Sequence, residues 1–171
     1  MVNQKFLTKG SGVLAEAQAI ATSSGAGDAG KIPCLDENGK IAENMMPTGV
    51  SAETQVAKAG TGGLAANDVV YLHLVTTTLT ADKADATDAT KRAQGYVKDA
   101  VSEGDDATVF LDGELPGSGF TPGAKYYLTT TPGTVSTTPP SGSGNMVQCV
   151  GEAVSSTAIK FDPDKMPIVL V

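Results

Sequence analysis

The side chains able to perform chemistry are few in this sequence of 171 residues, and the single histidine, His73, comes first among them. A nucleophilic triad requires a histidine that moves protons between a nucleophile and its leaving group. His73 lies within the apolar run Val69–Val75, on the same predicted strand face as Tyr71, and no serine stands in a G-x-S-x-G nucleophile elbow. We therefore predict that His73 packs within its strand, that no residue is catalytic, and that the protein is not an enzyme.

Metal ions and phosphate-bearing cofactors require ligand spacings that this sequence lacks. Asp36 and Asn38 resemble the start of a calcium loop, but the later ligands and the closing glutamate are missing, which favours a simple turn. The glycine-rich stretches Gly60–Gly63 and Gly117–Gly119 do not lead into the Gly-Lys-Ser/Thr of a phosphate-binding loop. We expect no metal site and no cofactor.

Two cysteines, Cys34 and Cys149, lie one in each half of the chain. Together with His73 they do not form a spacing typical of zinc ligands. A disulfide between them is one interpretation, but in a reducing cytosol free buried thiols are the simpler one. The acidic pairs and triplets, such as Asp105–Asp106 and Asp82/Asp85/Asp88, lie in polar stretches, where a solvated surface explains them better than acid–base catalysis.

The formal net charge is −7, so the surface repels nucleic-acid backbones. Lys91–Arg92 is the only adjacent basic pair, and no aromatic side chains alternate with it to stack on bases. No apolar run of about 18 residues exists to span a membrane. The first 27 residues lack the order of regions found in a signal peptide, so we expect synthesis in the cytoplasm, with no nucleic-acid or membrane partner.

The elements that would position these side chains are short strands at regular spacing. Val69–Val75 has the strongest pattern, and the polar stretch Thr80–Lys91 is expected to be a loop or a short capped helix. The other predicted strands are Ala93–Lys98, Ala107–Leu111, Lys125–Thr130, Val147–Val154, Ala158–Phe161 and Ile168–Val171.

Turn residues separate these predicted strands. Thr121–Pro122–Gly123 and Thr131–Pro132–Gly133 suit type II turns, in which proline takes the second position and glycine supplies a positive φ. Asp112–Gly113 predicts another turn, and Thr131–Asn145 reads as a surface loop. The pattern predicts a mainly β fold, a small antiparallel β-barrel or β-sandwich.

The N-terminal region has a different composition. Residues 1–30 are predicted to be a flexible docking arm, because their two apolar clusters, Phe6–Leu7 and Val13–Leu14, are too sparse for a core. The stretch LAEAQAIA from Leu14 has a helix-forming composition but is short for an isolated helix. Residues 31–49 are predicted to form a β-hairpin turning at Asn38–Gly39, followed by an apolar plug at Met45 and Met46. Residues 50–171 form the predicted barrel or sandwich domain.

Three segments resemble a known family. FTPGAKYYL from Phe120 is followed by a Thr-Thr-Pro-Pro loop, the strand VQCVG from Val147 and a closing strand that ends in Asp-Pro. This order is similar to a module found in structural proteins of tailed bacteriophages. GTGGLAANDVVYL from Gly60 looks like the opening strand of that module, and DAGKIPCLDENGKIAENMMPTG from Asp28 is similar to another phage structural segment.

Together these segments cover most of residues 28–171, and the chain resembles a head decoration protein, also called capsid cement. The resemblance implies a virion protein on the capsid surface, whose partners are the major capsid protein and further copies of itself, as a homodimer or homotrimer. It implies no catalytic residue. The candidate capsid or subunit contacts are the apolar residues of the N-terminal region: Phe6, Leu7, Val13, Leu14, Met45 and Met46. The alternative is that these residues pack on their own domain.

Two other functions fit parts of the sequence. A phage tail or fibre component shares the module, but a fibre is expected to show trimeric repeats or a long shaft, which a short chain lacks. A carbohydrate-binding β-sandwich would need exposed aromatic side chains along a groove. The four tyrosines, Tyr71, Tyr96, Tyr126 and Tyr127, are instead predicted to lie in strands or in the core.

Overall fold

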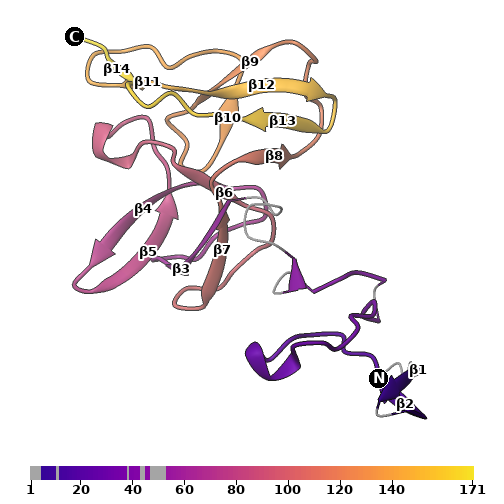
Figure 1. Cartoon of the computed structure of the whole chain (residues 1–171). Coiled ribbons are helices and arrows are strands. Elements are labelled where there is room, and N and C mark those ends of the chain that lie inside the picture. Colours follow the sequence, from indigo (N-terminus) through magenta and orange to yellow (C-terminus); the bar gives the residue numbers. More distant parts are fainter. Residues whose placement is uncertain (1–4, 11, 38, 43–44, 47–52) are drawn as a thin grey trace. The chain divides into compact units, whose positions relative to one another are not determined.

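A computed structural model of the chain describes residues 5–10, 12–37, 39–42, 45–46 and 53–171. The chain divides into two compact units, Met1–Ser51 and Ala52–Val171, here called the N-terminal unit and the C-terminal unit (Figure 1). The predicted mainly β fold is confirmed, and it includes a closed five-stranded barrel. Asn38, residues 43–44 and residues 47–49 of the predicted hairpin and plug lie outside the described residues.

The N-terminal unit contains one antiparallel hairpin, β1 (Lys5–Gly10) and β2 (Val13–Gln18). Strand β2 replaces the helix that the composition of this stretch favours. This stretch is a strand because it pairs with β1 along the full length of both strands, whereas a helix of about eight residues is only marginally stable on its own. The last part of the predicted arm, residues 23–30, contains the 3-10 turn η1 (Ala26–Asp28), which hydrogen bonds to the Asp28 carboxylate hold in place.

The predicted hairpin at residues 31–49 forms its turn without a strand ladder in the described residues. Asp36 N–H donates to Lys40 O and Gly39 N–H donates to Asp36 O, at 2.7 and 3.1 Å, and Gly39 has a φ of 73°. The chain before the turn instead pairs backward, through a parallel bridge between Pro33 and Ile20. The segment before the turn therefore pairs with an earlier part of the chain, at Ile20, instead of with the predicted second strand after the turn.

The first half of the C-terminal unit is the closed barrel, with the strand order β3-β5-β4-β6-β7. Strands β3 and β5 pair in parallel and every other neighbouring pair is antiparallel. Small side chains such as Ala57, Ala81 and Ala107 fill much of the interior, as a barrel of five strands leaves little room. The bounds are β3 (Thr54–Ala59), β4 (Val69–Val75), β5 (Thr78–Lys83), β6 (Gly95–Val97) and β7 (Asp106–Phe110).

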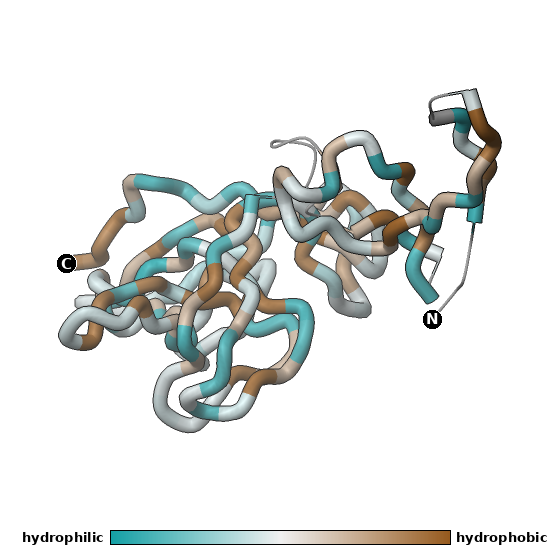
Figure 2. The backbone as a smooth tube through the Cα atoms, turned by 60° about the horizontal axis from the view of Figure 1, so that its bottom comes forward, coloured by the Kyte–Doolittle hydropathy of each residue, from teal (hydrophilic) through white to brown (hydrophobic). Residues whose placement is uncertain are grey.

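The second half of the C-terminal unit is an antiparallel sheet in the order β10-β9-β12-β13-β8, next to a separate pair, β11 and β14. Figure 2 shows short apolar stretches interrupted by polar ones along the chain. The bounds are β8 (Gly113–Pro116), β9 (Lys125–Leu128), β10 (Val135–Ser136), β11 (Met146–Val147), β12 (Cys149–Ser155), β13 (Ala158–Phe161) and β14 (Ile168–Val169).

Turn chemistry is the part of the sequence prediction that the structure follows most closely. Gly123 and Gly133 have φ values of 79° and 83°, and the predicted turns close through Ala124 N–H to Thr121 O and Thr134 N–H to Thr131 O. Four strands of the C-terminal unit were not predicted: β3, β5, β8 and β10, the last of which lies within the predicted surface loop Thr131–Asn145. Thr80–Lys91 is mostly strand and irregular chain, and only η3 (Ala89–Lys91) is helical, capped by the Asp88 carboxylate. Hydrogen bonds from Thr90 to that carboxylate lower the pKa of Asp88.

Tyr96 joins the barrel to the sheet. Its ring is fully buried, stacks on Phe110 and meets Phe161 edge-on, and its hydroxyl donates to Glu114 O at 2.8 Å. The cluster around it includes residues of both halves of the unit, among them Val69 of β4 and Leu115 of β8. The C-terminal unit therefore has two cores, one inside the barrel and one between the barrel and the sheet.

The stability of this unit is expected to fall in alkali because of Tyr96. Burial, with the nearby Asp112 and Glu114 charges, raises the pKa of Tyr96 to about 12 from 10.0. The unfolded chain loses the proton first as pH rises, so the free energy of unfolding declines from pH 10 toward pH 12, by up to about 2–3 kcal/mol. Urea unfolding of the wild type and of Tyr96→Phe across this pH range measures the decline. Tyr96→Phe should have a lower free energy of unfolding than the wild type at neutral pH, but should lose less of it in alkali. An equal loss in both proteins would contradict the assignment of the decline to Tyr96.

Candidate docking site

The hairpin of the N-terminal unit separates the predicted contact residues onto two faces. Residues directly opposite in an antiparallel pair share a face, and faces alternate along each strand. The register pairs Phe6 with Ala17 and Gly10 with Val13, which places Phe6 and Val13 on one face. It pairs Leu7 with Glu16 and Lys9 with Leu14, which places Leu7 and Leu14 on the other.

The face with the two leucines is open to solvent. Leu7 is 71% exposed and Leu14 is 68% exposed. An ion pair between Lys5 Nζ and Glu16 Oε2, at 2.9 Å, lies on the same face. This face therefore offers apolar side chains bordered by opposite charges, a composition typical of the surface of a protein interface.

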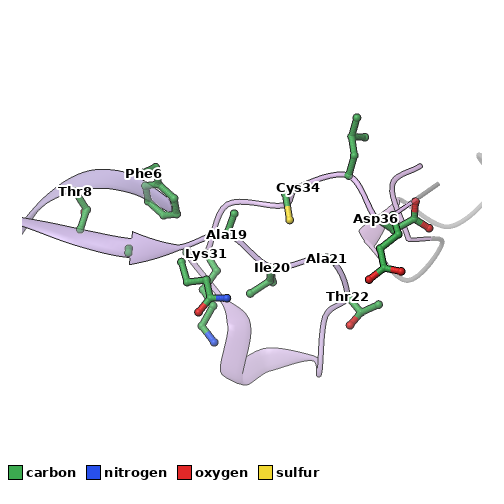
Figure 3. A pocket seen from close by; sticks show the side chains of 14 residues that line it. Phe6, Thr8, Ala19, Ile20, Ala21, Thr22, Lys31, Cys34 and Asp36 are labelled. Carbon is green, nitrogen blue, oxygen red and sulfur yellow. The ribbon is translucent and has the colours of Figure 1, made fainter. Parts of the chain in front are cut away.

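The face with Phe6 borders a cavity of about 830 Å³ within the N-terminal unit. Figure 3 shows Phe6 and Thr8 at the hairpin end, Ile20 and Cys34 along the middle, and Asp36 at the far end. Small and apolar side chains from residues 17–22 and 34–35 make most of its wall, and polar side chains of residues 36–37 close it. The cavity is large enough to hold several side chains of a partner.

Backbone hydrogen bonds hold the walls of this cavity together. Ile20 N–H donates to Ile32 O at 3.0 Å, and Cys34 N–H donates to Ile20 O at 2.8 Å. Near η1, the hydrogen bond from Lys31 and the one from Ser24 N–H lower the pKa of Asp28. Cys34, at 9% exposure, is the one buried apolar residue in the described part of this unit. The unit is thus ordered by hydrogen bonds with little hydrophobic core of its own.

Met45 and Met46 lie apart from both hairpin faces in the chain. They are half-buried, and a turn from Met45 N–H to Ala42 O, at 2.9 Å, holds them. Neither lines the cavity. The structure thus brings Leu7 and Leu14 together, places Phe6 at the cavity and Val13 on the same hairpin face, and leaves the two methionines as a separate feature.

Sequence reasoning missed the cavity residues Ile20 and Leu35, and it missed the hairpin itself. The sequence signal for the hairpin is Gly12, which lies in a two-residue loop between the two six-residue strands. In the structure Gly12 has a φ of 84°. A glycine in such a loop is typical of β-hairpins.

His73 has a partner that the sequence did not reveal. His73 Nε2 lies 2.8 Å from Asp82 Oδ2, and the His73 ring stacks on Tyr71 with centroids 4.9 Å apart. The backbone of Gly60 packs so closely on Asp82 that a Cβ atom there would meet the carboxylate. Thr80, opposite His73 in the register, donates its hydroxyl to Thr78 O. These contacts link strands β3, β4 and β5 on the outside of the barrel.

The part of the chain that the structure describes contains no disulfide, no cluster of metal ligands and no membrane-spanning helix. Both cysteines are free thiols, Cys34 buried and Cys149 half-buried. No group of three or more His, Cys, Asp or Glu residues among the described positions is arranged to hold a metal ion. Over the same positions, no helix has the length and apolar character needed to span a membrane.

Comparison of the chain with protein-family models, with curated proteins and with solved structures gives no match.

Proposed function

We propose that this chain is a structural protein of a tailed bacteriophage virion, which binds the outside of the capsid lattice and stabilises it. The hairpin of the N-terminal unit carries the proposal. It exposes Leu7 and Leu14 on a unit whose described part buries only Cys34 among its apolar side chains. An isolated two-stranded hairpin is at best marginally stable in water, so a partner is needed to cover it. The resemblance of residues 28–171 to phage structural segments favours a capsid subunit as that partner.

Docking would use two kinds of contact. Among the strands that the structure describes, β1 pairs with β2 alone, so a strand of a capsid subunit can add to the outer edge of β1 through backbone hydrogen bonds. The leucine face and the cavity beside Phe6 then bury apolar side chains of the same subunit. The role requires neither catalysis nor a cofactor, nucleic acid or membrane.

The C-terminal unit suits an external position on such a lattice. Its two cores are independent of the N-terminal unit, so it can remain folded while the hairpin docks. Attachment of many copies, which also contact one another, raises the overall strength of binding beyond that of one hairpin. The partners in this proposal are the major capsid protein and further copies of this chain.

Purified protein mixed with expanded, empty phage heads tests the proposal. We expect added density on the outer surface of the heads by electron cryomicroscopy, and a higher temperature of head disruption. Binding stabilises the bound state by mass action, so the shift should grow with protein concentration. Binding to phage tails or to host glycans, with none to heads, would contradict the capsid proposal and favour a tail component or a carbohydrate-binding module.

A further inference from the structure

One backbone edge of strand β14 (Ile168–Val169) has no partner among the described residues. Its only strand neighbour in the described structure is β11, in a separate two-stranded sheet. Leu170, just beyond it, donates its N–H to Asn145 O at 2.9 Å and accepts at its C=O from Gly144 N–H at 2.8 Å. The backbone groups of successive strand residues point to opposite edges, so Val169 directs its N–H and C=O away from β11.

The side chains around this edge are apolar and exposed. Met166 is 89% exposed, Ile168 67% and Val169 46%. No charged residue occurs between Met166 and Val171, and Figure 2 shows the tube beside the C label as hydrophobic. Proteins normally protect an edge strand with charges or with very short pairing. The edge strand β8 carries the charged Glu114, whereas β14 carries no charged side chain and is protected by its length of two residues.

We propose that β14 pairs antiparallel with β14 of a second copy of this chain, about a two-fold axis at Val169. The proposal rests on the self-association included in the proposed function, and it is independent of capsid binding. Each Val169 N–H donates to the Val169 C=O of the other copy. In the same register Pro167 lies opposite Val171, so Pro167, which has no N–H, still accepts from Val171 N–H.

Charge favours this edge as the place where two copies of the chain meet. Each chain carries a net charge of −7, which by itself opposes self-association. The segment from Met166 to Val171 has no charged side chain, so two copies can meet there without opposing charged side chains. A two-fold contact uses the same patch on both partners, so one exposed strand supplies both halves of the interface.

Sedimentation velocity of the full chain at increasing concentration tests this pairing. The wild type should be a dimer at micromolar concentrations. Val169→Lys places two ammonium groups directly opposite each other, and it should raise the dimer dissociation constant at least about tenfold. Val154→Lys is the matched control, because Val154 is 52% exposed on β12 and lies outside β14, and it should dimerise as the wild type does.

A mixing experiment makes the test specific. Val169→Lys and Val169→Glu should each be largely monomeric alone, and a mixture of the two should recover the dimer, because opposite charges then meet at the two-fold axis. Circular dichroism checks that each variant is folded. If Val169→Lys fails to fold, Ile168→Lys takes its place.

Three results would overturn the pairing: a monomeric wild type, dimers that Val169→Lys leaves as strong as the control, or a mixture that stays monomeric. Head binding is measured separately with the same variants. A failure of this pairing with retained head binding would leave the capsid proposal standing, and the reverse result would leave the pairing standing.

Discussion

Binding to phage heads is expected to weaken by roughly a hundredfold or more when Leu7→Lys and Leu14→Glu are combined in one chain. Both leucines lie on the same hairpin face and are about two-thirds exposed or more in the free protein. Burying a leucine contributes about 1.5–3 kcal/mol, so two lost contacts account for such a change. Titration of heads with fluorescently labelled protein measures it.

The two substitutions are chosen so that the hairpin itself survives. Lysine at position 7 faces Glu16 and glutamate at position 14 faces Lys9, so each new charge meets an opposite charge across the strands. The net charge of the chain does not change. A loss of binding would therefore report the missing apolar contacts rather than an unfolded hairpin or altered long-range electrostatics.

The matched control makes the same exchange in the C-terminal unit, as Leu74→Lys with Val75→Glu. Leu74 is 67% exposed and Val75 is 51% exposed, close to the values on the hairpin. The control should bind heads as the wild type does. If the control weakens binding and the hairpin variant does not, the docking surface lies on the barrel, and the hairpin proposal is wrong.

The second large effect is expected from Gln148→Leu, which should lower the free energy of unfolding of the C-terminal unit by roughly 3–5 kcal/mol. Gln148 is 1% exposed, and its side-chain amide makes three hydrogen bonds to backbone groups. Its Oε1 accepts from Ala93 N–H at 2.7 Å, and its Nε2 donates to Ala93 O at 3.0 Å and to Asp164 O at 2.9 Å. Leucine fills a similar volume but leaves the buried backbone groups of Ala93 without partners, which costs about 1–3 kcal/mol for each.

Calorimetry should show this change as a melting temperature lower by roughly 10–20 °C for a unit of this size. Gln55→Leu is the control, because Gln55 is exposed on β3 and its side-chain amide donates to the neighbouring carbonyl oxygen of Val56. The control should melt close to the wild type. Equal melting of Gln148→Leu and the wild type would show that the Gln148 hydrogen bonds do not connect the barrel segment to the sheet segment as described.

The residues that the sequence placed correctly are those governed by local rules. Val69–Val75 and Ala158–Phe161 are strands over the predicted ranges. The two Pro-Gly turns formed because proline fixes its own φ and glycine adopts the positive φ that follows at no steric cost. Strand β3 was missed for a local reason too: its inward residues are the small Ala57 and Ala59, which a narrow barrel needs but which give a weak β pattern.

The candidate docking site is only half visible in the sequence. Its apolar residues Phe6, Leu7, Val13 and Leu14 stand out in a polar, glycine-rich region. Their division between two faces depends on the register of β1 against β2, and a shift of one residue would exchange the faces.

The sequence by itself determined that the chain is mainly β, where most strands and turns fall, and that the N-terminal region carries apolar residues without enough neighbours to bury them. The tertiary structure decided how the strands combine: the parallel pairing that closes the barrel, the contact of His73 with Asp82, and the unpaired edge of β14. The physical reason is the range of the interactions. Dihedral preferences and alternation act between near neighbours in the chain, whereas strand pairing and burial depend on residues far apart, whose partners no local pattern specifies.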